Sequence, residues 1–144
     1  MRRTVISLLV AIPVAGCQAS THDLPKTPDM PLLSSGAAEA IAGDLAARLA
    51  QEETPAATTI FIAGDRSQFA MTLERALSDW GYAVSNDPGS DKRSNAVSLS
   101  YSLTGLEGQI LARLSTPETS FGRIYTASDT GAEPDGPFTV LQHD

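Results

Sequence analysis

Apolar residues recur at helical spacing in two stretches of the chain. The first covers residues 36 to 52, follows Ser34 and Ser35 as capping residues, and ends before Pro55. The second is capped by Asp65 or Ser67, and Gly81 stands where a left-handed C-terminal cap is expected. We therefore expect two amphipathic helices. Their apolar stripes are Ala38, Ile41, Ala42, Leu45 and Leu49 in the first, and Phe69, Leu73, Ala76, Leu77 and Trp80 in the second.

Short β-branched runs and period-two alternation predict the strands. Residues 58 to 63 and 82 to 85 flank the second helix as a strand-helix-strand unit, whose strands are adjacent or separated by one inserted strand. A polar loop follows at 86 to 94. Three alternating segments then predict an antiparallel meander, with Ser98, Ser100 and Ser102 on its solvent-exposed face. These segments are residues 97 to 103, 109 to 115 and 121 to 127.

The end of the chain is less regular. Residues 129 to 136 form an acidic loop rich in glycine and proline, and residues 138 to 141 either close an edge strand or dock on a partner. Together the elements predict one small α+β domain over residues 35 to 144, with a mixed sheet of about five strands and two helices on one face.

A proline-rich tether precedes this domain at residues 17 to 34. Pro25, Pro28 and Pro31 lie three residues apart, a spacing that favours an extended, flexible chain. The alternative for the end of this tether is that Leu32 and Leu33 dock as a short recognition segment.

The first 17 residues carry the parts of a lipoprotein signal in order. Two arginines precede an apolar run of about ten residues, which is shorter than the roughly 20 residues that a membrane-spanning helix needs. Two small residues then lead to Cys17, the only cysteine in the sequence. This pattern resembles the bacterial lipobox, which implies removal of residues 1 to 16 by cleavage between Gly16 and Cys17, and a diacylglyceryl and N-acyl lipid on Cys17. An ordinary secretory signal is the alternative, but it would leave a lone thiol in an oxidising compartment.

Charge narrows the choice of partners. The formal net charge is −7, and removal of the two N-terminal arginines leaves eight basic and 17 acidic residues, or −9. Nucleic-acid binding depends on clustered lysine and arginine, so we expect no direct contact with nucleic acid. No second apolar stretch reaches membrane-spanning length, so the lipid is the expected membrane anchor.

Candidate chemistry is sparse. Of the two histidines, His22 lies in the tether and His143 near the C-terminus, and neither is expected at a strand end or helix cap where a site could be rigid. We expect no enzyme activity, no metal, no cofactor besides the covalent lipid, and no small-molecule substrate. Trp80, Tyr82 and Phe138 are the candidates for a protein interface, because aromatic residues anchor such contacts. For Trp80 and Tyr82, which flank Gly81, the alternative is core packing at the end of the helix.

Five segments, with the lipobox, resemble the family of the conjugal transfer lipoprotein TrbH. They are SGAAEAIAGDLAARL (35 to 49), ALSDWGYAV (76 to 84), GQILARLST (108 to 116), GRIY (122 to 125) and GPFTV (136 to 140). The family belongs to the mating-pair-formation apparatus, a type IV secretion system that moves plasmid DNA between Gram-negative bacteria.

The resemblance implies an outer-membrane lipoprotein that faces the periplasm and helps to assemble the transfer channel. Its implied partners are outer-membrane and periplasmic components of that channel. Gln18 stands where an aspartate commonly marks retention in the inner membrane, which agrees with the outer membrane. The alternative function is a periplasm-facing lipoprotein that regulates a cell-wall synthase or hydrolase.

Overall fold

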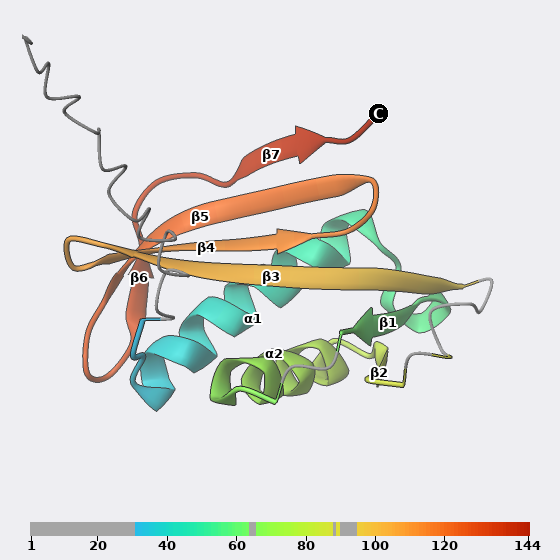
Figure 1. Ribbon diagram of the computed structural model, residues 1–144, viewed down its shortest axis with the longest axis horizontal. Coiled ribbons are helices and arrows are strands. Elements are labelled where there is room, and N and C mark those ends of the chain that lie inside the picture. Colours follow the sequence, from blue (N-terminus) through green and yellow to red (C-terminus); the bar gives the residue numbers. More distant parts are fainter. Residues whose placement is uncertain (1–30, 64–65, 88, 90–94) are drawn as a thin grey trace, which may run out of the picture.

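The computed structural model describes residues 31–63, 66–87, 89 and 95–144, in which two α-helices pack on one face of a seven-stranded mixed sheet (Figure 1). The strand order is β2-β1-β3-β4-β5-β6, and β7 also pairs with β5. The predicted α+β class is confirmed, although the sheet has two more strands than expected. The elements in chain order are α1 (Ser35–Glu52), the 3-10 turn η1 (Pro55–Ala57), β1 (Thr59–Ile62), α2 (Gln68–Asp79), β2 (Ala83–Ser85), β3 (Ala96–Leu106), β4 (Gln109–Ser115), β5 (Thr119–Ala127), β6 (Ala132–Pro134) and β7 (Thr139–Gln142).

Both helices begin at the predicted capping serines. The Ser34 hydroxyl accepts a hydrogen bond from the Ala37 amide in α1, and the Ser67 hydroxyl accepts one from the Ala70 amide in α2, each at 3.1 Å. All five residues of the first predicted stripe are buried. In the second stripe the structure buries Phe69, Leu73 and Leu77, half-buries Ala76 and exposes Trp80.

The parallel part of the sheet comes from the predicted strand-helix-strand unit. β1 pairs in parallel with β2 on one side and with β3 on the other. β2 therefore lies directly beside β1, which decides between the two arrangements expected from the sequence.

The antiparallel part is the predicted meander β3-β4-β5. Glu107 and Gly108 connect β3 to β4 with φ values of +44° and +87°, a two-residue turn whose twist matches that of the strands. Buried residues that face the helices form the core with both helices, whereas Ser98, Ser100 and Ser102 are exposed on the opposite face. The buried core residues of the meander are Leu99, Leu103, Ile110, Ala112, Leu114, Phe121 and Tyr125.

The two additional strands come from segments of mixed prediction. β6 lies inside the expected acidic loop and pairs with the end of β5, so the prediction of a loop over all of residues 129 to 136 is wrong. β7 confirms the edge-strand alternative for residues 138 to 141 and pairs with the beginning of β5.

The start of α1 holds the loop before β6 at close range. A Cβ atom added at Gly36 would lie 2.3 Å from the Thr130 carbonyl oxygen, and the Ser34 hydroxyl donates to the Ser128 carbonyl at 2.9 Å. A residue without a side chain is thus required where this loop crosses the helix.

Residues that precede α1 already pack against the domain. Leu33 packs against the core, and Pro31 lies beside Gly105 near the end of β3. The described end of the predicted tether therefore contacts the domain. The signal peptide at 1 to 16, the rest of the tether and part of the loop at 86 to 94 lie outside the described residues, and the predictions about them stay predictions.

Candidate functional site

Cys17 and the cleavage position after Gly16 lie outside the described residues. Their predicted lipidation and processing therefore remain predictions. The structure does place the three candidate interface residues, Trp80, Tyr82 and Phe138, and it separates them.

Trp80 and Tyr82 have opposite environments on the two sides of Gly81. Gly81 has a φ of +96°, the expected left-handed cap, and this turn directs its two neighbours apart. Trp80 caps α2 and is 50% exposed, so its place in the buried stripe was predicted wrongly. Tyr82 is only 4% exposed, and its hydroxyl donates to the Glu53 carbonyl at 2.7 Å. Tyr82 is thus a core residue that does not offer an exposed surface.

The Tyr82 hydroxyl is held in its neutral form. Burial, with a smaller contribution from the charge of Glu53, raises the pKa of Tyr82 to about 12. Burial also raises the pKa of Glu53, and the neighbouring carboxylates of Glu118 and Glu52 add to this rise. The end of α1 therefore concentrates negative charge near a buried tyrosine.

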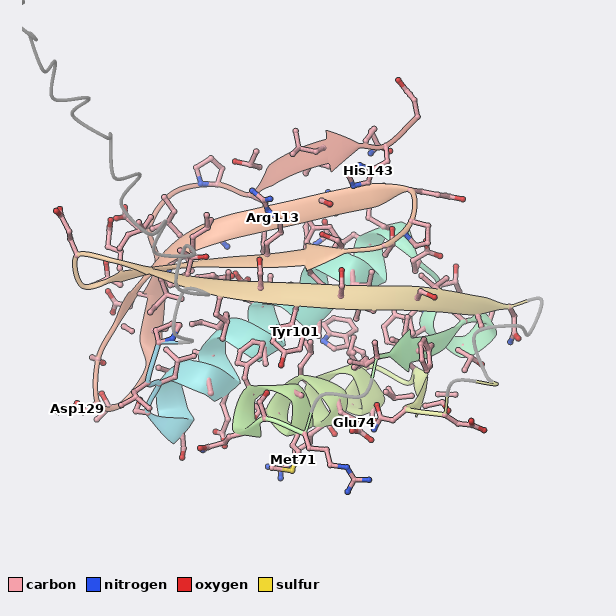
Figure 2. The ribbon with its side chains drawn as sticks, in the orientation of Figure 1. Met71, Glu74, Tyr101, Arg113, Asp129 and His143 are labelled. Carbon is pink, nitrogen blue, oxygen red and sulfur yellow. The ribbon has the colours of Figure 1, made fainter. Side chains whose placement is uncertain are left out.

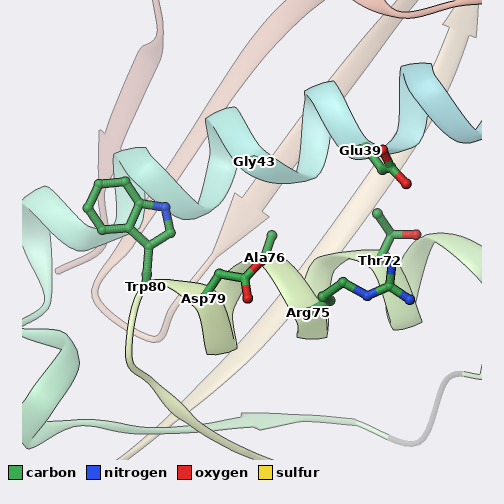
Figure 3. A pocket seen from close by; sticks show the side chains of 7 residues that line it. All are labelled: Glu39, Gly43, Thr72, Arg75, Ala76, Asp79 and Trp80. Atoms are coloured by element: carbon green, nitrogen blue, oxygen red, sulfur yellow. The ribbon is translucent and has the colours of Figure 1, made fainter.

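A groove of about 380 Å³ lies beside Trp80 along the seam of the two helices. Figure 3 shows the indole at one end of the groove, Glu39 on α1, and Arg75 and Asp79 on α2. Gly43 and Ala76 line it as well, so its walls are charged and two of its lining residues are small.

Phe138 faces the domain. It is half-buried, its ring stands edge-on to Phe121 with 6.1 Å between centroids, and the Arg123 guanidinium lies 4.9 Å from its centroid. Its ring fastens the segment before β7 to the core, and a role of Phe138 at a partner interface stays a prediction.

Arg123 joins this segment to α1. Its Nη1 lies 3.0 Å from Asp44 Oδ2, and its Nε donates to the Gly136 carbonyl at 2.7 Å. The Tyr125 hydroxyl donates to the same Asp44 oxygen at 2.7 Å. Burial and this hydrogen bond raise the pKa of Tyr125 above its usual range. We call Asp44, Arg123 and Tyr125 the Asp44 cluster.

The sequence held a signal for this cluster. Arg123 alternates with Phe121 and Tyr125 on the face of β5 that points to the helices, and a charge at such a position requires a partner. The partner is Asp44, which lies 79 residues away in the chain and was not predicted.

β7 is an exposed edge strand. All four of its residues are exposed, with Val140 at 39% and Leu141 at 50%, and none of the four is charged. Val140 lies opposite Phe121 and Leu141 opposite Ser120, so their side chains project to the two faces of the sheet. The other edge of β7 has no strand partner among the described residues.

The C-terminus is nevertheless held in place beside β7, where Figure 2 labels His143. The His143 amide donates to the Glu118 carbonyl at 2.8 Å, and His143 Nε2 lies 2.7 Å from Ser120 Oγ. The expectation that His143 lies away from any strand end was wrong, because it directly follows β7.

Ser120 and His143 form a pair that the sequence did not predict, because they meet only through the pairing of β5 with β7. The Ser120 hydroxyl donates to Ser115 Oγ at 2.8 Å. Since a hydroxyl has one proton, the imidazole N–H is the donor to Ser120, and it does not act as the base that an activated nucleophile requires. Ser120 is also 6% exposed. This arrangement fits a structural tie for the C-terminus.

The open sheet face next to β7 is partly apolar. A hollow of about 220 Å³ is bordered by Leu111, Ile124 and Leu141, with Arg113 and Thr139 beside them. Exposed serines occupy the same face of β3, as predicted. The apolar part of this face is therefore continuous with the open edge.

Residues 31–63, 66–87 and 95–144 contain no group of three histidine, cysteine, aspartate or glutamate side chains placed to hold a metal ion. Neither helix there has the length and apolar character that crossing a bilayer requires.

Comparison with known proteins gives two matches. The family described as "Conjugal transfer protein TrbH" matches residues 20–144. A protein of Sinorhizobium fredii (strain NBRC 101917 / NGR234), named "Probable conjugal transfer protein TrbH", is 43% identical over 148 aligned positions, which cover 99% of each chain. No solved structure matches this chain.

Proposed function

This chain belongs to the TrbH family of conjugal transfer proteins, and from that membership we propose that it is a lipid-anchored structural component of the mating-pair-formation apparatus. Acylated at Cys17 and held in the outer membrane, the domain faces the periplasm. There it helps to assemble the channel through which plasmid DNA passes. The anchor is supported by the parts of a lipoprotein signal, which follow one another in the sequence before Cys17.

The observation that carries the assembly role is the exposed, uncharged edge of β7. Edge strands of stable monomers are usually protected by charges, bulges or covering segments, because their free N–H and C=O groups pair with other chains. β7 lacks charged residues, and the Asp44 cluster and the His143 contacts hold it in position. A rigid, unprotected edge is suited to binding.

We infer that the partner adds an extended segment to β7. In such strand addition, main-chain hydrogen bonds supply affinity and pockets for alternate side chains supply specificity. Val140 meets the added strand on one face and Leu141 on the other. The partly apolar hollow at Leu111 and Ile124, which Arg113 and Thr139 also line, extends the contact on the open face.

The proposed role is binding rather than catalysis. At the contact between Ser120 and His143, the Ser120 hydroxyl donates its proton to Ser115 and accepts one from the imidazole N–H. His143 therefore does not act as a base toward Ser120. A protein that contributes a surface to an assembly needs neither a nucleophile nor a metal.

Leu141→Lys in a conjugating donor strain tests the proposal. Leu141 is half exposed, so the domain should keep its fold, while a lysine on the edge strand opposes strand pairing. We expect a drop in transfer frequency and loss of co-purifying transfer proteins. Ser102→Lys is the matched control, because Ser102 is exposed on the same face but two strands from β5.

The outcomes separate the parts of the proposal. Unchanged transfer and unchanged co-purification in Leu141→Lys would overturn strand addition at β7. Cys17→Ser should release the protein from the outer membrane and lower transfer, and retention in the membrane would overturn the anchor. Normal transfer after deletion of the gene, with recovery of a cell-wall synthase or hydrolase, would instead support the regulator alternative.

A further inference from the structure

We propose that the end of the domain formed by Leu32 and the β3-β4 turn rests on the surface of a lipid bilayer. Leu32 and Leu106 enter the bilayer interface and fix the orientation of the domain. This inference deepens the proposed function and rests on the proposed lipid at Cys17.

The two leucines are exposed at one end of the molecule. Leu32 is 103% exposed and Leu106 is 49% exposed. A Cβ atom at Gly105 would lie 3.6 Å from the Pro31 Cβ atom, so the residues that precede the two leucines are in contact although they are 74 positions apart. Figure 1 shows the β3-β4 turn and the start of α1 at the same end, with the C-terminus at the other.

The local structure presents both side chains outward. Leu106 is the last residue of β3 and pairs with Gln109 across the tight turn of Glu107 and Gly108. Beside Leu32 a hollow of about 210 Å³ is bordered by the core residues Phe69 and Leu103. It is lined by Pro31, Leu32, Leu33, Ala38, Gln68, Phe69 and Leu103.

The chain leading to the proposed anchor identifies the bilayer as the occupant. The described chain begins at Pro31, at this end of the domain, and only 13 residues (18 to 30) separate it from Cys17. That segment spans at most roughly 46 Å when fully extended, so the anchor keeps this end within reach of the membrane. Apolar side chains on a tethered domain enter the interface when it is this close.

The charge of this end indicates an apolar contact. Residues 31–34 and 103–109 contain one charged side chain, Glu107, and no basic residue. Acidic residues of the loop around β6 also lie at this end, since the Gln109 side chain contacts Asp135 and the Ser34 hydroxyl donates to the Ser128 carbonyl, so binding should be no stronger on anionic vesicles than on neutral ones.

A label on an introduced cysteine tests the contact in the full-length acylated protein. Because Cys17 is the only natural cysteine and its thiol is acylated, Leu106→Cys supplies one free thiol for an environment-sensitive fluorophore. The protein is reconstituted on vesicles of phosphatidylethanolamine and phosphatidylcholine. We expect blue-shifted emission and quenching by brominated lipid for the label at 106. The matched label at Leu141→Cys, 50% exposed on β7, should report water.

A second variant tests the role of Leu32. With the label at 106, Leu32→Glu should lower the ratio of docked to undocked protein roughly tenfold or more, because burial of a leucine side chain is worth at least such a factor. An unchanged ratio would overturn the contribution of Leu32.

The outcomes distinguish this inference from the anchor on which it rests. Co-flotation with the vesicles together with a water-like label at 106 would overturn the inference and leave the anchor intact. Failure to co-float, with a second labelled thiol at position 17, would instead overturn the anchor. A blue shift that persists without vesicles and grows with protein concentration would show that a second copy covers this end.

Discussion

Replacement of Asp44 by alanine should destabilise the domain and loosen β7. Asp44 is the shared acceptor for Tyr125, which donates at 2.7 Å, and for Arg123 at 3.0 Å. Tyr125 is 1% exposed, so its hydroxyl cannot turn to solvent when the acceptor is removed. Arg123 keeps its bond to the Gly136 carbonyl, but loses the contact that holds it to α1.

The magnitude follows from the burial of the two donors. A buried hydroxyl left without its partner costs about 1–3 kcal/mol. The ion pair adds at most about 1 kcal/mol, because the side chains of Arg123 and Asp44 are 23% and 30% exposed and solvent screens their attraction. We expect the free energy of unfolding to fall by about 1–4 kcal/mol in Asp44→Ala.

A double-mutant cycle with Tyr125→Phe isolates the buried hydrogen bond. The measurement is urea unfolding of the non-acylated Cys17→Ser chain, followed by circular dichroism. Tyr125→Phe should destabilise the otherwise unchanged Cys17→Ser chain but restore stability in Asp44→Ala, where it removes the buried hydroxyl that has lost its acceptor. Effects that add to within about 0.3 kcal/mol would refute the reasoning, since independent sites behave in that way. Hydrogen exchange at β7 should also quicken in Asp44→Ala, because Arg123 links Asp44 to the segment before β7.

Two other perturbations have signs that the structure decides. Gly36→Ala should lower the free energy of unfolding by about 1–3 kcal/mol, because the new Cβ atom would meet the Thr130 carbonyl oxygen at 2.3 Å. Gly43→Ala in the same helix has open space and should raise the free energy of unfolding by up to about 1 kcal/mol. Thermal unfolding of both variants measures the difference, and equal effects would contradict this reasoning. Glu53→Gln should stabilise the domain at pH 7 and have little effect near pH 3. The fold raises the pKa of Glu53, so protonated Glu53 is favoured in the folded state. The stability that this protonated form contributes is lost as the pH rises through the folded pKa. Unfolding curves at both pH values test it, and an equal effect at the two would contradict the electrostatic cause.

Sequence periodicity predicted the main elements because each is decided by local rules. Ser34 and Ser67 cap the helices that they were expected to cap, and Gly81 adopts the left-handed conformation. The alternation in β3 correctly assigned its serines to the exposed face. These features depend on side-chain spacing and backbone geometry within a few residues.

The errors fall where non-local contacts decide the outcome. β6 is three residues long and ends in Pro134, so its pairing with β5, not its own propensity, makes it a strand. Whether aromatic rings enter the core also depends on non-local packing: Tyr82 is buried in the core and Phe138 is half-buried against it. Trp80 fits the helical stripe by spacing and is exposed because α2 ends at Asp79 and the chain turns at Gly81.

The sequence by itself determined the α+β class, the two helices, the meander, the family resemblance and the lipid-anchor prediction at Cys17. All of these depend on short-range patterns or on local motifs. Only the tertiary structure decided that Asp44 joins Arg123 and Tyr125, that Ser120 meets His143, and that β7 has an open edge. Those contacts join residues up to 81 positions apart, and the pairing of such distant residues depends on how sheet and helices pack, which no local pattern specifies.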